Sequence, residues 1–557
     1  MNILKKLVIL IRILVGCILT ETTHGQNIDI TSVVRDTSQI DWHTLSTGIP
    51  LSSPLYGDLN QLSGLKGFDF LYSGERPLSR THVSALISKV QSKIHTDPYL
   101  NNTFFKTYLD GLDQRYGSGS QGRRPAGRFR FRSLNVQYLW LNQPGRIIPE
   151  TSGILIPFLS NREGRTFDRD HNIAVEGSAD FQLASFAVLG TEVRWRQGSN
   201  TDQPGQLGLR RLYLKLRLKA IEFQLGRDSL TWGHGFSGSL GLSSNAKPFE
   251  FIKISNWKTT LLPWYFRYLG PFNYQVFFAR LDKDRLDFPN PFLFSIHIQS
   301  KPTSWFEISA YRWMMLGGAG STSSGFNEFI SDLIMYRVGD FQNRSRINNA
   351  GGVNLKFRLP FFNGMFIYSD TYWEDVGRAA KNGVISLIHF PFQPNRFSKE
   401  NANKSGVSIP NLLAHGRLSL DLEQVISARI IYRHGIYTSG YTHEQRLLGH
   451  DLGPAGHAGY MKMSSQVTPR FRLHFFAALE RRGDEGQNPA DLIVLRKNPT
   501  HARAEWRYRV IPGFLWRMKS NQSLIGQVGY ERVHHFNYIH RDDRHNTLFE
   551  LKLQRLF

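Results

Sequence analysis

The sequence predicts a membrane all-β protein: an antiparallel outer-membrane β-barrel of about 18 strands, preceded by a small N-terminal α-helical bundle. Three observations lead to this prediction. Apolar and polar residues alternate along most of the 557-residue chain, the chain ends on an aromatic residue, and the connections between alternating segments are short and long in turn. Beyond the N-terminus, no uninterrupted apolar run is long enough for a membrane-spanning helix.

Residues 1–25 are predicted to form a secretion signal. Two lysines precede an apolar run from Leu7 to Leu19, which only Arg12 interrupts, and small or polar residues follow as far as Gly25. A second possibility is that Cys17 is the lipidated first residue of the mature chain. Either route exports the protein, and together with the barrel pattern it predicts the outer membrane of a Gram-negative bacterium.

The composition of the chain limits the classes of binding partner that it suits. The chain has 68 Lys and Arg against 45 Asp and Glu, a formal net charge of +23, and a single cysteine, which excludes an internal disulfide. Export argues against a nucleic-acid partner. The positive charge therefore suits acidic glycans, lipopolysaccharide phosphates or small anions.

Residues 26–120 are predicted to form the helical bundle, placed in the periplasm. Apolar residues recur at helical spacing from Ser79 to Ile94, with Ser79 as the N-cap, and again from Pro98 to Tyr116. A weaker helix is expected within Pro54 to Leu65. The stripe residues expected in the bundle core are Val83, Leu86, Ile87, Val90, Ile94, Phe105, Tyr108, Leu109, Leu112 and Tyr116.

Residues 121–557 are predicted to form the barrel. The clearest hairpin runs from Leu212 to Leu225, with its turn at Lys219-Ala220, and each strand alternates apolar with polar residues. If Phe557 lies at the periplasmic edge, the connections between strands, counted from the C-terminus toward the N-terminus, alternate between short and long. An even number of strands, with both barrel ends in the periplasm, follows from that count.

The faces opposite the apolar residues carry many cations. If the apolar faces contact lipid, these cations point into the barrel and favour anions in the lumen. The alternative is that some of them snorkel or pair with inward-facing acids. The predicted lumen-lining cations are Lys215, Arg217, Lys219, Lys356, Arg358, Arg429 and Arg472.

Three segments carry a family resemblance. Gly226-Arg227-Asp228, Trp232-Gly233-His234-Gly235 and Ser243 to Pro248 resemble the hallmark run of the capsule-assembly Wzi family of outer-membrane proteins. Asn349-Ala350-Gly351, the strand that follows it, and Tyr372 to Asp375 resemble a second region of the family. Ser244 and His234 depart from the family pattern, where Asn and Pro are expected.

The resemblance implies an 18-stranded barrel with a periplasmic helical bundle. It also implies a surface lectin that attaches capsular or exopolysaccharide to the cell, without catalysis and without a cofactor. The competing hypothesis is an anion-selective porin or polysaccharide export channel with the same barrel.

Other chemistry has weaker signals. The segment around Ser237 misses the nucleophile-elbow pattern of hydrolases by one position, so no catalytic residue is predicted. Asp168, Asp170 and Asn172 begin like a calcium loop but lack its glycine and its final glutamate. The histidine-rich stretch from His534 to His545 has no metal-ligand spacing, so no metal site is predicted.

Sugar binding requires flat aromatic faces and planar polar groups. The long connections and one adjoining strand end supply such residues, although each of them could instead pack in the barrel interface. We expect an acidic polysaccharide and the membrane lipid as partners, and a monomeric protein. The predicted polysaccharide-binding set is Arg227, Trp232, His234, Asn245, Lys247, Trp373, Glu374, Tyr437 and Tyr441.

Overall fold

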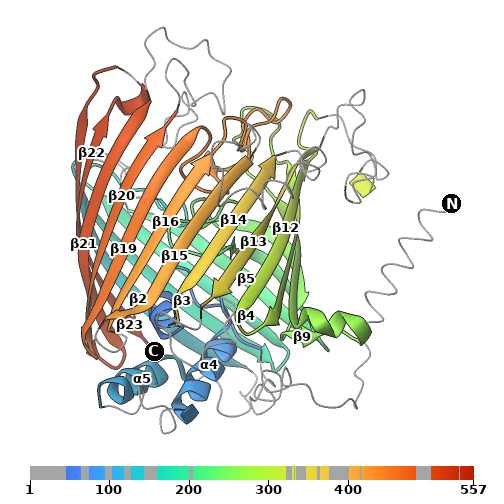
Figure 1. Ribbon diagram of the computed structural model, residues 1–557, viewed down its shortest axis with the longest axis vertical. Helices are drawn as coiled ribbons and strands as arrows, with labels where there is room; N and C mark the ends of the chain where they lie inside the picture. The colour runs from blue at the N-terminus through green and yellow to red at the C-terminus, as the bar shows by residue number, and fades with distance from the viewer. Residues whose placement is uncertain are drawn as a thin grey trace, which may run out of the picture.

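The computed structural model is dominated by one closed antiparallel β-barrel (Figure 1). The structure describes residues 45–63, 74–93, 103–117, 127–143, 158, 160–199, 205–321, 329–330, 333, 347–359, 364–374, 401–413, 417–483, 504–538 and 540–557. The predicted signal at residues 1–25, Cys17 and Pro98 lie outside these residues.

The barrel strands follow one another around the wall, and the last strand, β23, closes the ring by pairing with the first, β2. β8 and β9 both pair with β10 and act as one interrupted strand, so the predicted number of 18 is confirmed. The strands are β2 (Arg128–Leu141), β3 (Asp170–Ala184), β4 (Ala187–Gly198), β5 (Gln206–Leu218), β6 (Ile221–Asp228), β8 (Phe249–Asn256), β9 (Thr260–Leu261), β10 (Pro271–Arg280), β11 (Phe292–Thr303), β12 (Phe306–Leu316), β13 (Asn348–Arg358), β14 (Phe366–Glu374), β15 (Asn401–Leu413), β16 (Leu418–Ser427), β19 (Gly456–Thr468), β20 (Phe471–Arg482), β21 (Glu505–Lys519), β22 (Gln522–His534) and β23 (Arg544–Leu556).

The apolar and polar residues that alternate in the sequence face the outside and the inside of the barrel wall in turn. On β5, Leu212 and Leu216 face outward and are exposed, whereas Tyr213 and Lys215 face inward and are buried. The hairpin of β5 and β6 turns at Lys219-Ala220, as predicted. An apolar outer surface of this kind is what a barrel embedded in lipid requires.

The two ends of the barrel differ. We call the end that carries the turn between β5 and β6 the short-turn end, and the opposite end, which carries residues 229–248 and 428–455, the long-loop end. One short-turn connection is longer than predicted: next to Gly270 it contains the 3-10 helix η3 (Trp264–Leu269), which has no buried residue. Exposed aromatic residues are typical of a barrel at the membrane interface.

Three helices share one core at the short-turn end. They are α3 (Leu55–Leu62), α4 (Arg80–Lys93) and α5 (Thr103–Tyr116), and the predicted stripes of α4 and α5 meet in it. The Ser79 hydroxyl accepts a hydrogen bond from the His82 N–H at 3.2 Å, so Ser79 caps α4 as expected. None of the described helices has both the length and the apolar character needed to cross a membrane.

The helices α4 and α5 lie beneath the lower rim of the barrel in Figure 1, and the helical part contacts the short-turn ends of several strands. On α3, the Asp58 carboxylate is buried between Arg472 of β20 and Arg517 of β21. Burial alone raises the pKa of Asp58, but the two guanidinium groups outweigh it and hold this pKa below its usual value. On α5, Arg115 donates a hydrogen bond to the Lys519 carbonyl at 2.7 Å.

Candidate functional site

Residues 229–248 enter the barrel instead of projecting from it. Lys404 of β15 is fully buried and donates hydrogen bonds to the carbonyls of His234 and Gly238. Glu423 of β16 accepts hydrogen bonds from the Phe236 and Ser237 N–H groups at 2.7 and 2.9 Å. The inward-facing polar residues of the wall thus replace the water that the backbone of this segment would otherwise need. We call residues 229–248 the inward loop.

A glycine allows this close approach. Gly235 has a φ of 94°, and a Cβ at this position would overlap the Glu423 carboxylate. A larger residue would be strained in this left-handed conformation and would also displace the wall.

The inward loop meets the helical part of the chain inside the barrel. Its β7 (Thr231–Trp232) pairs with β1 (Glu75–Arg76), and the Gly233 N–H donates to the Gly74 carbonyl at 2.8 Å. Glu75 in turn contacts His297 of β11 at 2.8 Å. The chain therefore crosses the lumen from the short-turn end to the inward loop.

A second layer covers the inward loop at the long-loop end. Residues 428–455, which include β17 (Thr442–His443) and β18 (Arg446–Leu447), bind it through Ser243, whose N–H donates to the Leu448 carbonyl at 2.7 Å. Residues 160–167 bind it through Glu163, whose N–H donates to the Ser244 carbonyl at 2.6 Å. Among the described residues, these layers fill the barrel at this end.

Aromatic stacking holds the layers together. Trp232 lies on the His297 ring at 4.8 Å between centroids, and Tyr441 lies on Trp313 of β12 at 4.0 Å. Trp232, Trp313 and Tyr441 belong to a single buried apolar cluster that joins the inward loop, residues 428–455 and the wall. Such pairs add stability beyond the apolar area that they bury.

Most of the predicted polysaccharide-binding residues are part of this packing. The sequence left open whether each of them contacts sugar or packs in the barrel, and in the structure the side chains of seven of the nine are buried. Trp232, for example, is 1% exposed. A side chain without an exposed face cannot stack on a polymer. The buried members of the set are Trp232, His234, Asn245, Trp373, Glu374, Tyr437 and Tyr441.

Two members of the set remain half-exposed, and they lie together. The Arg227 side chain is 42% exposed and pairs with Glu250, and the Lys247 side chain is 40% exposed and pairs with Glu444. Both line a cavity of about 350 Å³ at the long-loop end, which we call the arginine notch. Its other basic lining residues are Arg165, Arg194, Arg196 and Arg210.

The arginine notch exists because β5 is longer than β6. Pairing between the two strands stops at Leu212 with Arg227, so residues 206–211 have no paired strand on that side among the described residues. A β-bulge sets Arg210 and Arg211 against Glu192 of β4 and turns both guanidinium groups toward the inside of the wall. Bulges commonly re-aim side chains in this way.

Sequence reasoning missed Arg194, Arg196 and Arg210. The available signal was the density of arginines at the upper ends of two adjacent strands, in Arg194-Trp195-Arg196 and Arg210-Arg211. The bulge that brings them together breaks the period-two alternation, and a one-residue slip in that pattern assigns a side chain to the wrong face.

Behind the arginine notch, acids and arginines alternate. Arg165 bridges Glu163 and Glu176, and Arg211 bridges Glu163, Glu192 and Asp228. Burial raises the pKa of Glu163, but Arg211 and Arg165 outweigh burial and hold it well below its usual value. These cations are neutralised where they are buried.

The lumen is also less cationic than predicted. Lys215 pairs with Glu222 at 2.9 Å, and Arg472 pairs with Asp58. Two other predicted residues are exposed and do not line the lumen: Lys219 lies in the short turn after β5, and Arg429 lies in the turn after β16. The buried acids that accompany the inward cations include Glu176, Glu192, Glu222, Asp370, Glu423, Glu480, Glu531 and Glu550.

The remaining predicted cations contact aromatic rings. Lys356 lies 4.3 Å from the centroid of Phe366, and Arg358 lies 5.8 Å from the same ring. Arg217 lies over Trp257 at 4.6 Å. These contacts belong to the wall and to its short-turn edge, away from the arginine notch.

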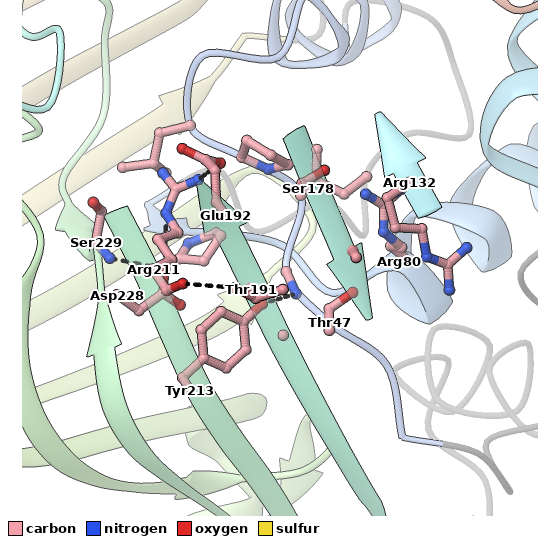
Figure 2. A pocket seen from close by; sticks show the side chains of 17 residues that line it. Thr47, Arg80, Arg132, Ser178, Thr191, Glu192, Arg211, Tyr213, Asp228 and Ser229 are labelled. Carbon is pink, nitrogen blue, oxygen red and sulfur yellow. Dashed lines mark hydrogen bonds and ion pairs between the residues drawn. The ribbon is translucent and has the colours of Figure 1, made fainter. Parts of the chain in front are cut away.

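A second, much smaller cavity of about 30 Å³ marks where the N-terminal segment meets the wall (Figure 2). The Tyr213 hydroxyl accepts a hydrogen bond from the Gly48 N–H at 3.2 Å, and Thr47 donates to Asp180 at 3.1 Å. This volume is sufficient for about one water molecule. The cavity is therefore a packing defect between two docked parts and is too small for a sugar.

Ser237 has a histidine neighbour that the sequence did not reveal. The Ser237 hydroxyl lies 3.2 Å from Nε2 of His450, and Asp451 lies 3.5 Å from Nδ1. However, the Leu452 N–H donates to Nδ1, which places the ring proton on Nε2. Nε2 then donates to the serine, whereas a general base must accept its proton. The group is buried and lines neither cavity.

The other weak signals are explained by local bonds. The Asn172 side chain accepts a hydrogen bond from the Asp168 N–H and donates one to its carbonyl, both at 2.8 Å. His534 pairs with Asp543 at 2.8 Å near η5 (Phe536–Tyr538). In the described part of the chain, no three potential ligand side chains are grouped to hold a metal ion.

Comparison with known families supports one assignment. The family model for capsule assembly protein Wzi matches residues 143–548, which is more than half of the chain. No curated protein matches the sequence.

Several solved structures are similar to this chain. The Wzi protein of Escherichia coli, an outer membrane protein involved in group 1 capsule assembly and described as a carbohydrate-binding β-barrel, is similar with 16% sequence identity and a TM-score of 0.63. The match covers 92% of this chain and 99% of that protein. OprD of Pseudomonas aeruginosa matches over 78% of this chain and 96% of its own, with 7% identity and a TM-score of 0.43.

Proposed function

Because this chain belongs to the Wzi family of capsule assembly proteins, we propose that it binds capsular or exopolysaccharide at the long-loop end and holds that polymer on the cell surface without catalysis. Membership of the family places the chain in the outer membrane. The carbohydrate-binding activity described for the Escherichia coli protein is extended here to this chain.

The arginine notch is the observation that carries the proposal. It is the larger of the two cavities described above, it lies at the long-loop end, and only one of its lining side chains, Glu444, is an acid. That carboxylate is already paired with Lys247. A basic notch of this kind favours an acidic polymer, and Arg227 and Lys247 are the members of the predicted binding set that such a polymer reaches.

The contents of the lumen argue for an anchor over a pore. The helical part lies at the short-turn end, β1 pairs with the inward loop inside the described barrel, and Lys404 and Glu423 fix the loop to the wall. An anion-selective porin or export channel requires a continuous aqueous path. We further propose that the protein acts as a monomer; the closed barrel leaves no free strand edge through which a second copy could extend the sheet.

The proposed orientation puts the long-loop end outside the cell and the helices in the periplasm. Lys283 and Lys219 are exposed at the two ends, and the mature chain lacks a cysteine if residues 1–25 are removed. Lys283→Cys should react with a membrane-impermeant maleimide on intact cells, whereas Lys219→Cys should react only after lysis. The opposite labelling would reverse the orientation.

The function is tested by deleting the gene and measuring cell-bound and released polysaccharide. The anchor proposal predicts that the bound fraction falls while the total amount is unchanged, and that re-expression restores it. Because the notch is basic, high salt should release bound polymer, since screening at 1 M salt shortens the Debye length to about 3 Å. A fall in the total amount would indicate synthesis or export, and an unchanged distribution would refute the proposal.

A further inference from the structure

We propose that the arginine notch is a seat for the carboxylate of an acidic sugar residue, taken up from the side of the barrel through the gap above β6. This inference rests on the proposed function and specifies its ligand. It assigns the contact to Arg194, Arg210 and Lys247, of which only Lys247 belongs to the set predicted from the sequence.

Arg194 has a donor group without an acceptor. Its side chain is buried, its guanidinium lies 5.0 Å from the centroid of Phe167, and its Nε lies 3.2 Å from Glu176. Glu176 is shared with Arg165, and Nη2 of Arg194 is buried without a hydrogen bond to any described residue. A buried donor left unsatisfied is unfavourable, so an acceptor entering the notch gains the bond that the protein lacks.

Arg210 supplies a second donor from the neighbouring strand. Its Nη2 donates to the Glu163 carbonyl at 2.7 Å, which fixes the side chain in place. Its Nε is buried, lies 3.6 Å from Glu192 and makes no hydrogen bond within the described chain. Two oriented guanidinium groups match the planar, two-oxygen shape of a carboxylate, and such charge-assisted bonds are about twice as strong as neutral ones.

The basic residues at the rim of the notch favour a negatively charged ligand. Lys247 and Arg227 are half-exposed, and each is paired with one acid, Glu444 and Glu250 respectively. Arg227 also donates a hydrogen bond from Nη1 to the Leu209 carbonyl at 3.4 Å, so it is held across the gap at the rim. A cation entering the notch would meet five arginines and a single acid, Glu444, which is already paired with Lys247. A neutral sugar would leave the buried donors facing hydroxyls, which are weaker acceptors than a carboxylate.

Size and depth indicate a sugar carboxylate in preference to a lipid phosphate. A volume of about 350 Å³ lies at the low end for ligand pockets, which suits one or two sugar rings. Arg194 lies on the inward face of β4, so the anion must pass the plane of the wall. A phosphate on an acylated headgroup is held in the outer leaflet by its chains and cannot follow.

The probe for this inference is the surface polysaccharide of the producing cell, used in its native form and after reduction of its carboxylates to alcohols. Binding is measured by calorimetry to the full-length protein in phospholipid nanodiscs without lipopolysaccharide. Native polymer should bind, and carboxyl reduction should weaken binding at least tenfold. Equal binding of both forms would refute the carboxylate seat while leaving the anchor function intact, and failure of both forms to bind would refute the anchor function itself.

Three variants locate the site. Arg210→Gln removes one donor, Lys247→Gln removes the rim charge, and Arg194→Lys retains a countercharge for Glu176 but loses the planar fork. Each should weaken binding of native polymer about tenfold or more, with little effect on binding of the reduced polymer. The matched control is Arg544→Gln, which breaks an ion pair between an arginine and a carboxylate, that of Asp542, at the same end of the barrel.

Folding of each variant is checked by its heat-modifiable migration on gels. Wild-type affinity in the folded Arg210→Gln and Lys247→Gln variants would overturn the proposal, and so would an equal loss in Arg544→Gln.

A final binding experiment adds lipopolysaccharide or its dephosphorylated form to the nanodiscs. Phosphate-dependent displacement of the polymer would show that the notch is a lipid headgroup site and would also overturn the proposal.

Discussion

The Asp58 carboxylate of α3 forms an ion pair of 2.5 Å with the Arg472 guanidinium of β20, although 414 residues separate the two in the chain. Arg517 of β21 binds the same carboxylate. One buried acid therefore ties the helical part to two adjacent strands of the barrel.

Loss of that acid should loosen the helices. Asp58→Asn leaves two buried guanidinium groups without their countercharge, and breaking a buried ion pair from one side costs about 3–5 kcal/mol. We expect faster amide hydrogen exchange in α3, measured by mass spectrometry. Asp110→Asn, on the exposed face of α5, is the control. Equal exchange in both variants and the wild type would mean that the apolar core alone holds the helices.

The same contact predicts the response to acid. Because the folded pKa of Asp58 is lowered, its contribution is present above the unfolded value of about 3.9 and is lost as the pH falls through the lower folded value. Protection of α3, corrected for intrinsic exchange, should be constant from about pH 8 to 5 and fall only below about pH 4. A loss of protection near pH 6 would point to a histidine instead.

The inward loop should keep the barrel closed. In planar bilayers we expect the wild-type protein to show no large, steady conductance. Lys404→Met removes the ammonium group that bridges the carbonyls of His234 and Gly238, so the loop should detach at times and produce transient openings. Lys258→Met, at an exposed position at the short-turn end, should behave as the wild type. Steady anion-selective openings in the wild type would favour the porin hypothesis.

Substitution of Trp232 should lower the stability of the barrel, because its side chain is buried in the packing of the inward loop. Trp232→Ala opens a cavity where the ring now lies on His297, and substitutions of this kind cost about 3–5 kcal/mol. The temperature of the heat-modifiable gel shift should fall. Trp305→Ala, at a position that is 52% exposed, is the matched control and should have little effect. An unchanged transition for Trp232→Ala would show that the loop does not stabilise the barrel.

The fold was predictable because its strands and helices follow from the short-range periodicity of apolar residues in the sequence. Alternation along β5 and β6 gave the hairpin and its faces, and spacing along α4 and α5 gave the helical core. Both patterns reflect local geometry and burial, so the residues of one segment are sufficient to predict its secondary structure and its buried face.

The site was predictable only in part, because it depends on contacts between distant segments. Whether Trp232 points to solvent depends on the inward course of its loop, which Lys404 and Glu423 impose from strands more than a hundred residues away. Tyr441 likewise packs on Trp313 of β12, which is more than a hundred residues away in the chain. Arg210 was missed for another reason: a bulge interrupts the alternation used to assign faces. Arg227 and Lys247 were identified from the family motif, and they are the predicted residues that the arginine notch contains.

The lipid-facing surface gives a prediction that depends on depth. Leu214 and Leu218 both face outward on β5. Leu214 is paired with Leu189 and Leu225, in the apolar band between the outward-facing Arg227–Glu250 ion pair and the short turn, whereas Leu218 lies at the short-turn end. An arginine facing lipid costs about 2–4 kcal/mol at the bilayer midplane and about 0–1 kcal/mol near the interface. Leu214→Arg should therefore lower the yield of heat-modifiable barrel, whereas Leu218→Arg should assemble nearly as the wild type. The two variants add the same charge to the same strand, so net charge and strand propensity cancel in the comparison. Equal assembly of both would mean that the membrane does not surround β5 at the height of Leu214, and equal failure would mean that the short-turn end is buried more deeply than the fold implies.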